Sequence, residues 1–533
     1  MLFFDVLIIG GGAAGLRAAI EAARMGANVA IASKAPIGYA SSTLYAGGGF
    51  RAAFKNYSAE RHFEETIIGG AFLNDQELVR TLVLEGKNRI LELKSLGVDL
   101  KIRPGGAFIE GPPLMTCINL VNPLAKYASN LNVKFIEGVM AIDLIVNGKV
   151  NGAILYDLNS NKLRLIQAKS IVIATGGYSQ LFLRNDNPVR ITGDGCVMAL
   201  KAGASLIDME FIQFFPLGLA EEKMPTWLFP AVYGKLVNSI GEDVLEKYNI
   251  KVPLHVAAIM HRDLLSRIIY KEISEGRGVN EALIIKLARP SETEESKVLT
   301  SIATSLANKL HISSNNIKVA PLAHFTMGGI EINTNCETSI PGLFACGEVT
   351  GGIHGANRLG GNALTEAIVF GARAGISAAK YAKNTKLESL DEKVIHKYEE
   401  KLSSLRNGNI NPKNLKYEVK KAMWKYCGVI RNKNKLNELI KIIDELKNKL
   451  DDVYAEKTYQ ILEALELQNM IQLSEIVAKA ALERNESRGA HYREDYPEMD
   501  NRNWLKRIVF KLKEDKIIIE YKPVELKYLA LRA

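Results

Sequence analysis

A glycine turn close to the start of the chain constrains the fold more than any other feature of the sequence. An apolar run over residues 5–9 leads directly into Gly10-x-Gly12-x-x-Gly15, a helix-forming segment follows, and a second apolar run covers residues 28–32. This order of strand, turn, helix and strand is a βαβ unit. Glycines at this spacing let the backbone approach a pyrophosphate, whose charge the free N–H groups of the helix terminus then bind. The unit therefore predicts a Rossmann-like domain that binds a dinucleotide, the alternative being a purely structural turn.

Later segments favour FAD over a nicotinamide as that dinucleotide. Ser33-Lys34 stands at the end of the second strand, where the general fingerprint has an acid that holds a ribose. A predicted β meander over residues 133–173 runs into the glycine segment 174–177, and the chain returns to the same fold near Gly347-Glu348. No second glycine fingerprint is present in the sequence. We therefore disfavour direct use of NAD(P)H.

Composition and charge exclude several other classes of protein. The 533 residues are 47% hydrophobic and 24% charged, which is ordinary for a globular chain. No CxxC pair occurs, so we expect no metal site and no iron–sulfur cluster in this chain. The net charge of +9 indicates a solvated surface or attraction of an anionic partner, and without a basic-aromatic motif we expect no nucleic acid. The five scattered cysteines, which fit a reducing compartment, are Cys117, Cys196, Cys336, Cys346 and Cys427.

No segment is predicted to cross a membrane or to act as a signal peptide. The most apolar stretch, residues 6–32, contains Arg17, Glu21 and Arg24. We therefore expect a cytoplasmic protein. A peripheral position on the inner face of the cell membrane, through partner subunits, is the alternative.

Motifs spread along the chain carry a family resemblance. They are the strand Val29–Lys34 with its terminal Ser-Lys, HFTMGGI at 324–330, HGANRLGGN at 354–362, residues 423–432, and ESRGAHYREDYP at 486–497. Together they resemble the flavoprotein subunit of succinate dehydrogenase and fumarate reductase, with L-aspartate oxidase as a nearer cousin than other flavoenzymes. The resemblance covers nearly the whole chain. The segment 503–506 and the basic tail look more like the succinate and fumarate enzymes.

The resemblance implies an α/β fold in which a capping domain of α+β type interrupts the FAD-binding domain and a helical domain follows. The expected segments are 1–215 and 321–385 for the FAD-binding domain, 216–320 for the capping domain that holds substrate, 386–500 for the helical domain and 501–533 for a C-terminal tail. Closure of the capping domain would exclude water from the reaction.

The resemblance also assigns three residues to catalysis. Arg358 and His324 would hold substrate carboxylates, and Arg262 would be the acid/base residue of the capping domain. Arginine suits a carboxylate because its fork is bidentate and permanently charged. The alternatives are a structural arginine, a packed core histidine and a surface charge cluster, respectively. The expected FAD-binding residues are Gly10, Gly12, Ala14, Gly15, Ser33, Lys34, Ser41, Thr43, Gly48, Gly49, Ala174, Thr175, Gly176, Asp194, Glu348, Arg358, Ala363 and Leu364. Among the other histidines, we expect His354 to lie in a loop or against the flavin, and His255 and His261 to be structural.

Three departures from the family pattern affect the chemistry. Ser42 occupies the position of the histidine that links FAD covalently, so we expect noncovalent FAD and lean toward fumarate reduction, aspartate oxidation or another acceptor. Phe215 replaces a histidine that hydrogen-bonds the substrate. The Thr-Glu pair expected near residues 228–231 is not apparent. A substrate with one carboxylate and an apolar arm would suit Phe215 better than an unmodified dicarboxylate.

We therefore expect an FAD-dependent oxidoreductase that interconverts fumarate and succinate, or a related pair of acids, by hydride transfer at flavin N5. Its partners would be a small carboxylic acid and an iron–sulfur subunit. A membrane-anchor subunit would be a further option. One alternative is an L-aspartate oxidase that works alone. The other is a noncatalytic FAD-binding assembly subunit, for which the altered pocket is the best argument.

Overall fold

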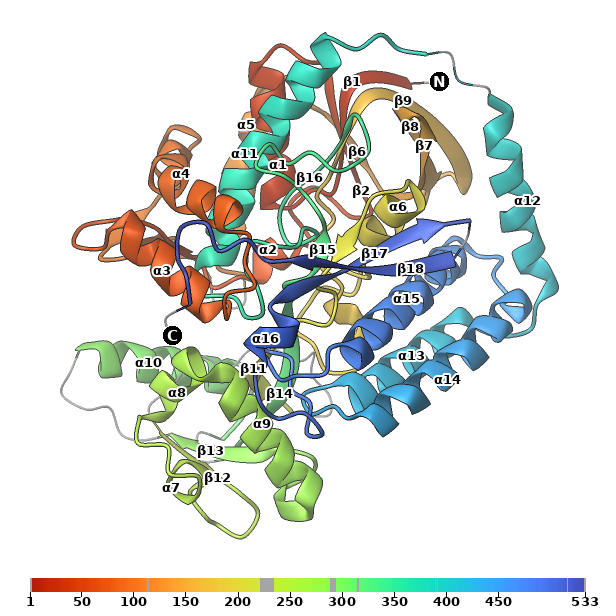
Figure 1. The fold of residues 1–533 in the computed structure, drawn as a ribbon. Helices are drawn as coiled ribbons and strands as arrows, with labels where there is room; N and C mark the ends of the chain where they lie inside the picture. Colours follow the sequence, from red (N-terminus) through yellow and green to blue (C-terminus); the bar gives the residue numbers. More distant parts are fainter. Residues whose placement is uncertain are drawn as a thin grey trace.

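The computed structural model describes residues 2–112, 115–220, 234–287, 294–313, 316–388, 390, 392–514 and 516–531. Its largest sheet has seven strands and forms the centre of the domain that is expected to bind FAD (Figure 1). Six follow one another in the order β6 (Lys134–Glu137), β2 (Val29–Ser33), β1 (Leu2–Ile9), β9 (Lys162–Ile173), β8 (Lys149–Asp157) and β7 (Val139–Asn147), and β16 (Leu343–Ala345) also pairs with β9. The chain thus returns at β16 to the sheet that its N-terminal strand begins.

Two helices far apart in sequence cover the same sheet. α1 (Ala13–Arg24) packs against α11 (Asn362–Lys383). The approach is close because α11 carries glycines at the crossing: a Cβ at Gly371 would lie 2.6 Å from the backbone oxygen of Ala14, and one at Gly375 would lie 2.1 Å from that of Ala18. Any larger side chain at Gly375 would force the helices apart.

The β meander differs from its prediction at both ends. The run at 133–136, expected to open the meander, is β6, which pairs in parallel with β2 at Ala30–Lys134. The helix α5 (Ile118–Asn130) precedes it, and a helical crossover delivers a parallel strand. The last part of the predicted meander is one long strand, β9, which pairs with β8 over residues 162–167 and with β1 over residues 166–173.

The insert has its own four-stranded sheet in the order β11 (Ile212–Leu219), β14 (Ile317–Thr326), β13 (Leu283–Leu287) and β12 (Gly234–Val237). Its helices are α7 (Val244–Lys247), α8 (Leu254–Met260), α9 (Arg262–Glu272) and α10 (Glu294–Lys309). A separate apolar core that includes Leu236, Leu265 and Ile285 holds them together. Both β11 and β14 extend past the expected boundaries at 215 and 320, so two strands connect the capping domain to the FAD-binding domain.

The C-terminal part consists of helices and a hairpin. The helices are α12 (His396–Ser404), α13 (Pro412–Cys427), α14 (Lys433–Asn448) and α15 (Thr458–Glu483). The predicted tail forms α16 (Asn501–Trp504) and the hairpin β17 (Lys506–Lys513) and β18 (Lys516–Pro523), which joins β10 (Leu206–Ile207) and β15 (Gly329–Ile330) in one sheet. The tail is thereby tied to the middle of the chain (Figure 1).

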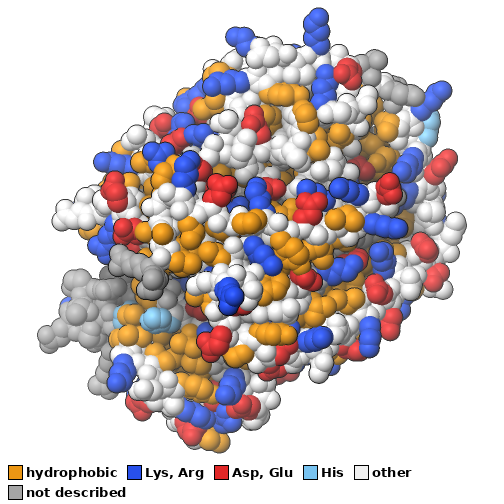
Figure 2. Space-filling model, in the orientation of Figure 1, with side chains coloured by type: hydrophobic (Ala, Val, Ile, Leu, Met, Phe, Trp, Pro, Cys, Tyr) orange, Lys and Arg blue, Asp and Glu red, His pale blue; other side chains and the backbone are white. Residues whose placement is uncertain are grey.

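The remaining elements lie around the N-terminal part: α2 (Ser42–Tyr45), β3 (Gly49–Arg51), α3 (Ala59–Gly69), α4 (Gln76–Ser95), β4 (Lys101–Arg103), β5 (Gly106–Phe108) and α6 (Asp194–Lys201). Among the helices that the structure describes, none combines the length and the apolar character needed to cross a membrane. On the face drawn in Figure 2, basic and acidic side chains are interspersed rather than gathered in one basic patch.

Candidate functional site

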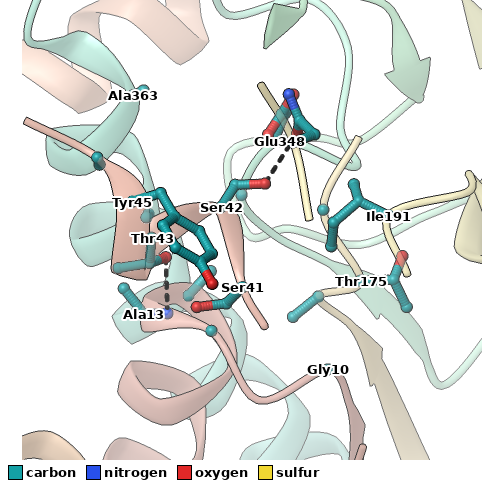
Figure 3. Close-up of a pocket in the computed structure, with 18 of the residues that line it drawn as sticks. Gly10, Ala13, Ser41, Ser42, Thr43, Tyr45, Thr175, Ile191, Glu348 and Ala363 are labelled. Carbon is teal, nitrogen blue, oxygen red and sulfur yellow. Dashed lines mark hydrogen bonds between the residues drawn. The ribbon is translucent and has the colours of Figure 1, made fainter. Parts of the chain in front are cut away.

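A cavity of about 530 Å³ opens between the glycine turn, the loop around α2 and the capping domain. Figure 3 shows the side of it that Gly10, Ser41, Thr43, Thr175 and Glu348 line. The structure brings the following predicted residues to this one cavity: Gly10, Gly12, Ala14, Ser33, Lys34, Ser41, Thr43, Gly48, Gly49, Ala174, Thr175, Gly176, Asp194, Glu348, Ala363 and Leu364, together with Arg262, His324 and Arg358. Gly15 is absent from the lining; a Cβ there would lie 2.0 Å from the backbone oxygen of Gly10, so it packs the helix against the turn.

The turn between β1 and α1 is built for an anion. Gly10 has φ +119°, and a Cβ there would lie 2.2 Å from the backbone oxygen of Ala174, so only glycine fits. No side chain caps the N-terminus of α1 at Gly12, and its first turn holds no acid. Its free N–H groups and positive end thus remain available to a phosphate, apart from the N–H of Ala13, which donates to Thr43 Oγ1 at 3.2 Å (Figure 3).

Two buried polar groups in the lining also fit a bound cofactor. The hydroxyl of Thr175 is buried without a hydrogen-bond partner among the described residues, and such groups are normally paired. Glu348 accepts a hydrogen bond from the backbone N–H of Thr326 at 3.1 Å. Burial raises the pKa of Glu348 to about 7. A ligand with hydroxyl groups, such as the ribityl and ribose parts of FAD, would satisfy both side chains.

Lys34 is held at the end of β2 by carboxylates from two other parts of the chain. Its ammonium lies 2.6 Å from Asp194 and 2.9 Å from Glu466 of α15. Glu466 also accepts from Lys416 at 2.6 Å. Burial would raise the pKa of Glu466, but Lys34 and Lys416 outweigh it and lower this pKa to about 2. The acid that the general fingerprint places at the end of the second strand is thus replaced by a lysine with two distant carboxylates. Asp194 was predicted as an FAD-binding residue but not as a partner of Lys34, and Glu466 was not predicted.

The two predicted arginines meet on one neutral acceptor. Gln213 Oε1 accepts from Arg262 Nη1 at 3.2 Å and from Arg358 Nη2 at 2.9 Å. Both arginines are at least nine-tenths buried, and neither forms an ion pair with a carboxylate of the described residues. Burial lowers the pKa of Arg262 to about 10 and that of Arg358 to about 9. Two buried cations that form no direct ion pair make this part of the cavity a candidate anion site.

Phe325 and Ile259 complete the surroundings of these arginines. The guanidinium of Arg358 lies 4.4 Å from the ring centre of Phe325, a cation–π contact. Arg262 Nη2 donates to the backbone oxygen of Ile259 at 3.1 Å. Burial of Arg262 argues against the surface cluster considered for it, and the pair formed by its neighbours Asp263 and Arg267, at 3.8 Å, is only partly exposed.

His324 and Phe215 form the neighbouring wall of the cavity. Their ring centres are 5.7 Å apart with an angle of 53° between the planes. His324 Nδ1 lies 2.7 Å from Asp186 Oδ2. The sequence did not point to Asp186, which sits in a loop outside every motif. The cavity therefore combines an anion site with an aromatic side chain.

Other predicted positions take the following places. Ser42 lines the cavity (Figure 3), and its hydroxyl donates to Asn187 Oδ1 at 2.9 Å. His354 is buried against Glu366 at 2.9 Å and is absent from the lining. The residues 228–231, where the Thr-Glu pair was sought, lie outside the described residues. Within the described ranges, no group of three or more histidine, cysteine, aspartate or glutamate side chains could hold a metal ion.

Comparisons with known proteins agree with this geometry. The family model described as FAD binding domain matches residues 5–364, and that described as fumarate reductase flavoprotein C-term matches residues 416–533. An uncharacterized FAD-dependent oxidoreductase of Methanocaldococcus jannaschii is 40% identical over 96% of both chains. One of the subunits of the CoM/CoB fumarate reductase of Methanothermobacter marburgensis is 37% identical over 93% of this chain and 94% of its own. A solved structure of E. coli quinol fumarate reductase FrdA, carrying one mutation, superposes with a TM-score of 0.89 at 30% identity, covering 99% of this chain and 98% of that one.

Proposed function

This chain belongs to the flavoprotein family of succinate dehydrogenase and fumarate reductase, and we propose that it reduces fumarate, or a related unsaturated carboxylic acid, or catalyses the reverse oxidation. As a member, it is an FAD-dependent oxidoreductase. The observation that carries the proposal is the pair of buried arginines, Arg262 and Arg358, that share the single amide oxygen of Gln213. An anionic substrate would give the two guanidinium groups the direct ionic partner that the described residues do not provide.

The residues at the glycine turn and around Lys34 would hold the FAD. Without a histidine at position 42 and with the Ser42 hydroxyl bound to Asn187, we propose that the cofactor is held noncovalently. When bound, FAD supplies a carrier for two electrons, transferred as a hydride at N5.

The side chains of this chain bind and polarise the acid. Arg358 would bind one carboxylate through its fork, and His324 would donate a hydrogen bond to a carboxylate oxygen. These groups draw electron density from the double bond toward the carboxylate, so the β-carbon of an unsaturated acid becomes more electrophilic. They also stabilise the negative charge that develops on the carboxylate in the transition state.

Arg262 would deliver the proton to the other carbon. A guanidinium normally keeps its proton, but burial lowers the pKa of Arg262 to about 10. Arg262 is also the first residue of α9, where the positive end of the helix disfavours a second positive charge. Because α9 belongs to the capping domain, domain closure would bring this donor to the substrate while excluding water.

Electron exchange would involve other subunits. In the described part of the chain no metal cluster has ligands. The electron partner that we propose is an iron–sulfur subunit, with a membrane anchor as a further component and a position on the cytoplasmic face; support comes from the relative that is named as one subunit of a fumarate reductase. A matched test is copurification of the native complex and measurement of its iron content.

The direct test is an anaerobic half-reaction. The bound FAD is reduced with dithionite to its endpoint, fumarate is added, and the flavin absorbance is followed. Rapid reoxidation is expected. If fully loaded protein with its native partners is not reoxidised, fumarate is not the acceptor. Crotonate, which has one carboxylate and a methyl arm, then tests the shape suggested by Phe215, and aspartate added to oxidised protein tests the amino acid oxidase alternative.

A further inference from the structure

A loop of the FAD-binding domain places a carboxylate against the imidazole of His324. Asp186 Oδ2 lies 2.7 Å from His324 Nδ1, and both residues line the cavity. The two are 138 positions apart, so only the fold brings them together. The side chain of Asp186 is 11% exposed and that of His324 is 24% exposed, so solvent screens this pair only in part.

Neighbouring contacts fix the loop and hence the direction of the carboxylate. Asn185 forms a parallel bridge with Ala323 of β14, directly before His324. Asn187 Nδ2 donates to the backbone oxygen of His324 at 3.1 Å and to Asp186 Oδ1 at 3.2 Å. One carboxylate oxygen of Asp186 is therefore held by the loop, and the other is directed at the imidazole.

We propose that Asp186 is the positioning residue for His324, an inference that rests on the proposed function. With Nδ1 bound to Asp186, Nε2 is the ring nitrogen left for a ligand, and no residue in the described ranges forms a hydrogen bond with it. The contact between Nδ1 and Asp186 orients the ring, and a ring nitrogen that carries a proton donates, so Nε2–H would bind a substrate carboxylate. Asp186 acts through His324 and not on the reacting atoms.

Because Asp186 is negatively charged, the effect of removing His324 on substrate binding should depend on whether Asp186 is present. Asp186 is close enough to Arg358 to act on its charge, so it lies in the field of the anion site. A carboxylate without a cationic partner there would repel an anionic substrate. The bond to His324 cancels that repulsion. Removal of His324 alone should therefore harm substrate binding more than removal of both side chains.

A double-mutant cycle on the FAD-loaded protein tests this. The variants are Asp186→Asn, His324→Gln and the pair combined, with Glu331→Gln as control because its carboxylate pairs with Lys522 at 2.8 Å and does not line the cavity. The probe is malonate, a dicarboxylate with no double bond to reduce. Its dissociation constant is read from the change in flavin absorbance and from the shift in thermal unfolding, and kcat and KM for fumarate are measured separately.

We expect Asp186→Asn to weaken malonate binding about tenfold, roughly the worth of one well-placed hydrogen bond to a charged group. In the His324→Gln background the same change should cause no loss and should restore part of the affinity. If Asp186→Asn loses its flavin, Asp186→Glu serves instead, since it keeps the charge but displaces the carboxylate and should raise KM more than it lowers kcat.

Two results would overturn the inference. Equal malonate affinity in wild type and Asp186→Asn would remove the role of Asp186 while leaving the proposed function standing, provided that fumarate still reoxidises the wild type. Losses that add in the double variant would show a purely structural role. Wild type that neither binds malonate nor reacts with any acid would instead remove the proposed function, and this inference with it.

Discussion

The ammonium of Lys34 lies 2.9 Å from the carboxylate of Glu466, although 432 residues separate them. Lys34 lines the cavity at the end of the first βαβ unit, and Glu466 is fully buried in α15 of the helical domain. The helical domain thus reaches the candidate FAD site through a buried carboxylate. This contact links the stability of the protein to the shape of the cavity.

We expect Glu466→Gln to destabilise the protein by about 3 kcal/mol, because removing one partner of a buried ion pair leaves charge uncompensated. Lys416 would lose its bond of 2.6 Å, whereas Lys34 would retain Asp194. Urea unfolding of the FAD-free protein measures the effect. Glu438→Gln is the control: its pair with Lys441 spans 3.7 Å at the surface, and a change of similar size there would contradict the prediction.

The same carboxylate predicts acid sensitivity. Its pKa is lowered to about 2 in the folded protein, from an ordinary value of 4.5. A carboxylate whose pKa is lowered by folding stabilises the folded protein above pH 4.5. This stabilisation is lost as the pH falls from 4.5 toward 2. The difference in unfolding free energy between wild type and Glu466→Gln should therefore be constant from pH 7 to 5 and shrink below 4.5. A difference that does not change between pH 7 and 3 would assign the stabilisation to another group.

Arg358→Lys should lower kcat/KM for fumarate by at least about a hundredfold while FAD remains bound. Lysine keeps the charge but loses the bidentate fork and the planar contact with Phe325. Steady-state kinetics with a reduced dye as electron donor gives the value, and the flavin content is the control. Activity within about threefold of wild type would mean that the substrate carboxylate binds elsewhere in the cavity and not at Arg358.

Phe215→His should shift the acid preference toward unmodified dicarboxylates. A histidine there would add a hydrogen-bond donor next to His324, whose ring centre is 5.7 Å away, and would remove apolar surface. The ratio of kcat/KM for fumarate to that for crotonate should rise about tenfold, the worth of one hydrogen bond. An unchanged ratio would mean that Phe215 does not contact the substrate.

Acid precipitation of the loaded protein should release all of its FAD into the supernatant. The hydroxyl of Ser42 is engaged with Asn187 and offers no imidazole for a link to the flavin. Absorbance of the supernatant and fluorescence of the denatured protein on a gel measure the two fractions. Flavin that stays with the pellet after proteolysis, as a flavin-bearing peptide, would contradict noncovalent binding.

The sequence was sufficient for the parts of this site that lie in local motifs. The glycine turn, the three catalytic candidates and almost all of the expected cofactor residues come to one cavity: the turn was predicted from its own spacing, and the catalytic candidates from the family resemblance that their motifs carry. Asp186 and Glu466 could not be predicted in the same way. Each meets its partner, His324 or Lys34, only through packing between segments 138 and 432 residues apart, and a lone acid in a loop or helix carries no spacing signal.

Two features of the fold escaped prediction for a related reason. A short apolar run indicates a strand but not its partner, so β6 was placed in the meander although it pairs with β2. The C-terminal residues were expected to be a tail, yet β17 pairs with β10 at Leu206–Phe510. Both pairings join segments whose contact depends on the global topology.

The packing of α1 on α11 has a consequence for biosynthesis. Ala18 leaves the ribosome some 350 residues before Gly375, the glycine that packs against its backbone oxygen. At about 5–20 residues per second, translation takes roughly 20 to 70 s to cover that distance. During this interval the surface of α1 that packs against α11 has no native partner, although α5 and the first strands can already cover the rest of the helix, and the capping domain with its separate core is completed in between. Nascent chains halted before residue 360 should therefore expose a binding site for chaperones at their N-terminal end, which disappears once translation passes the end of α11.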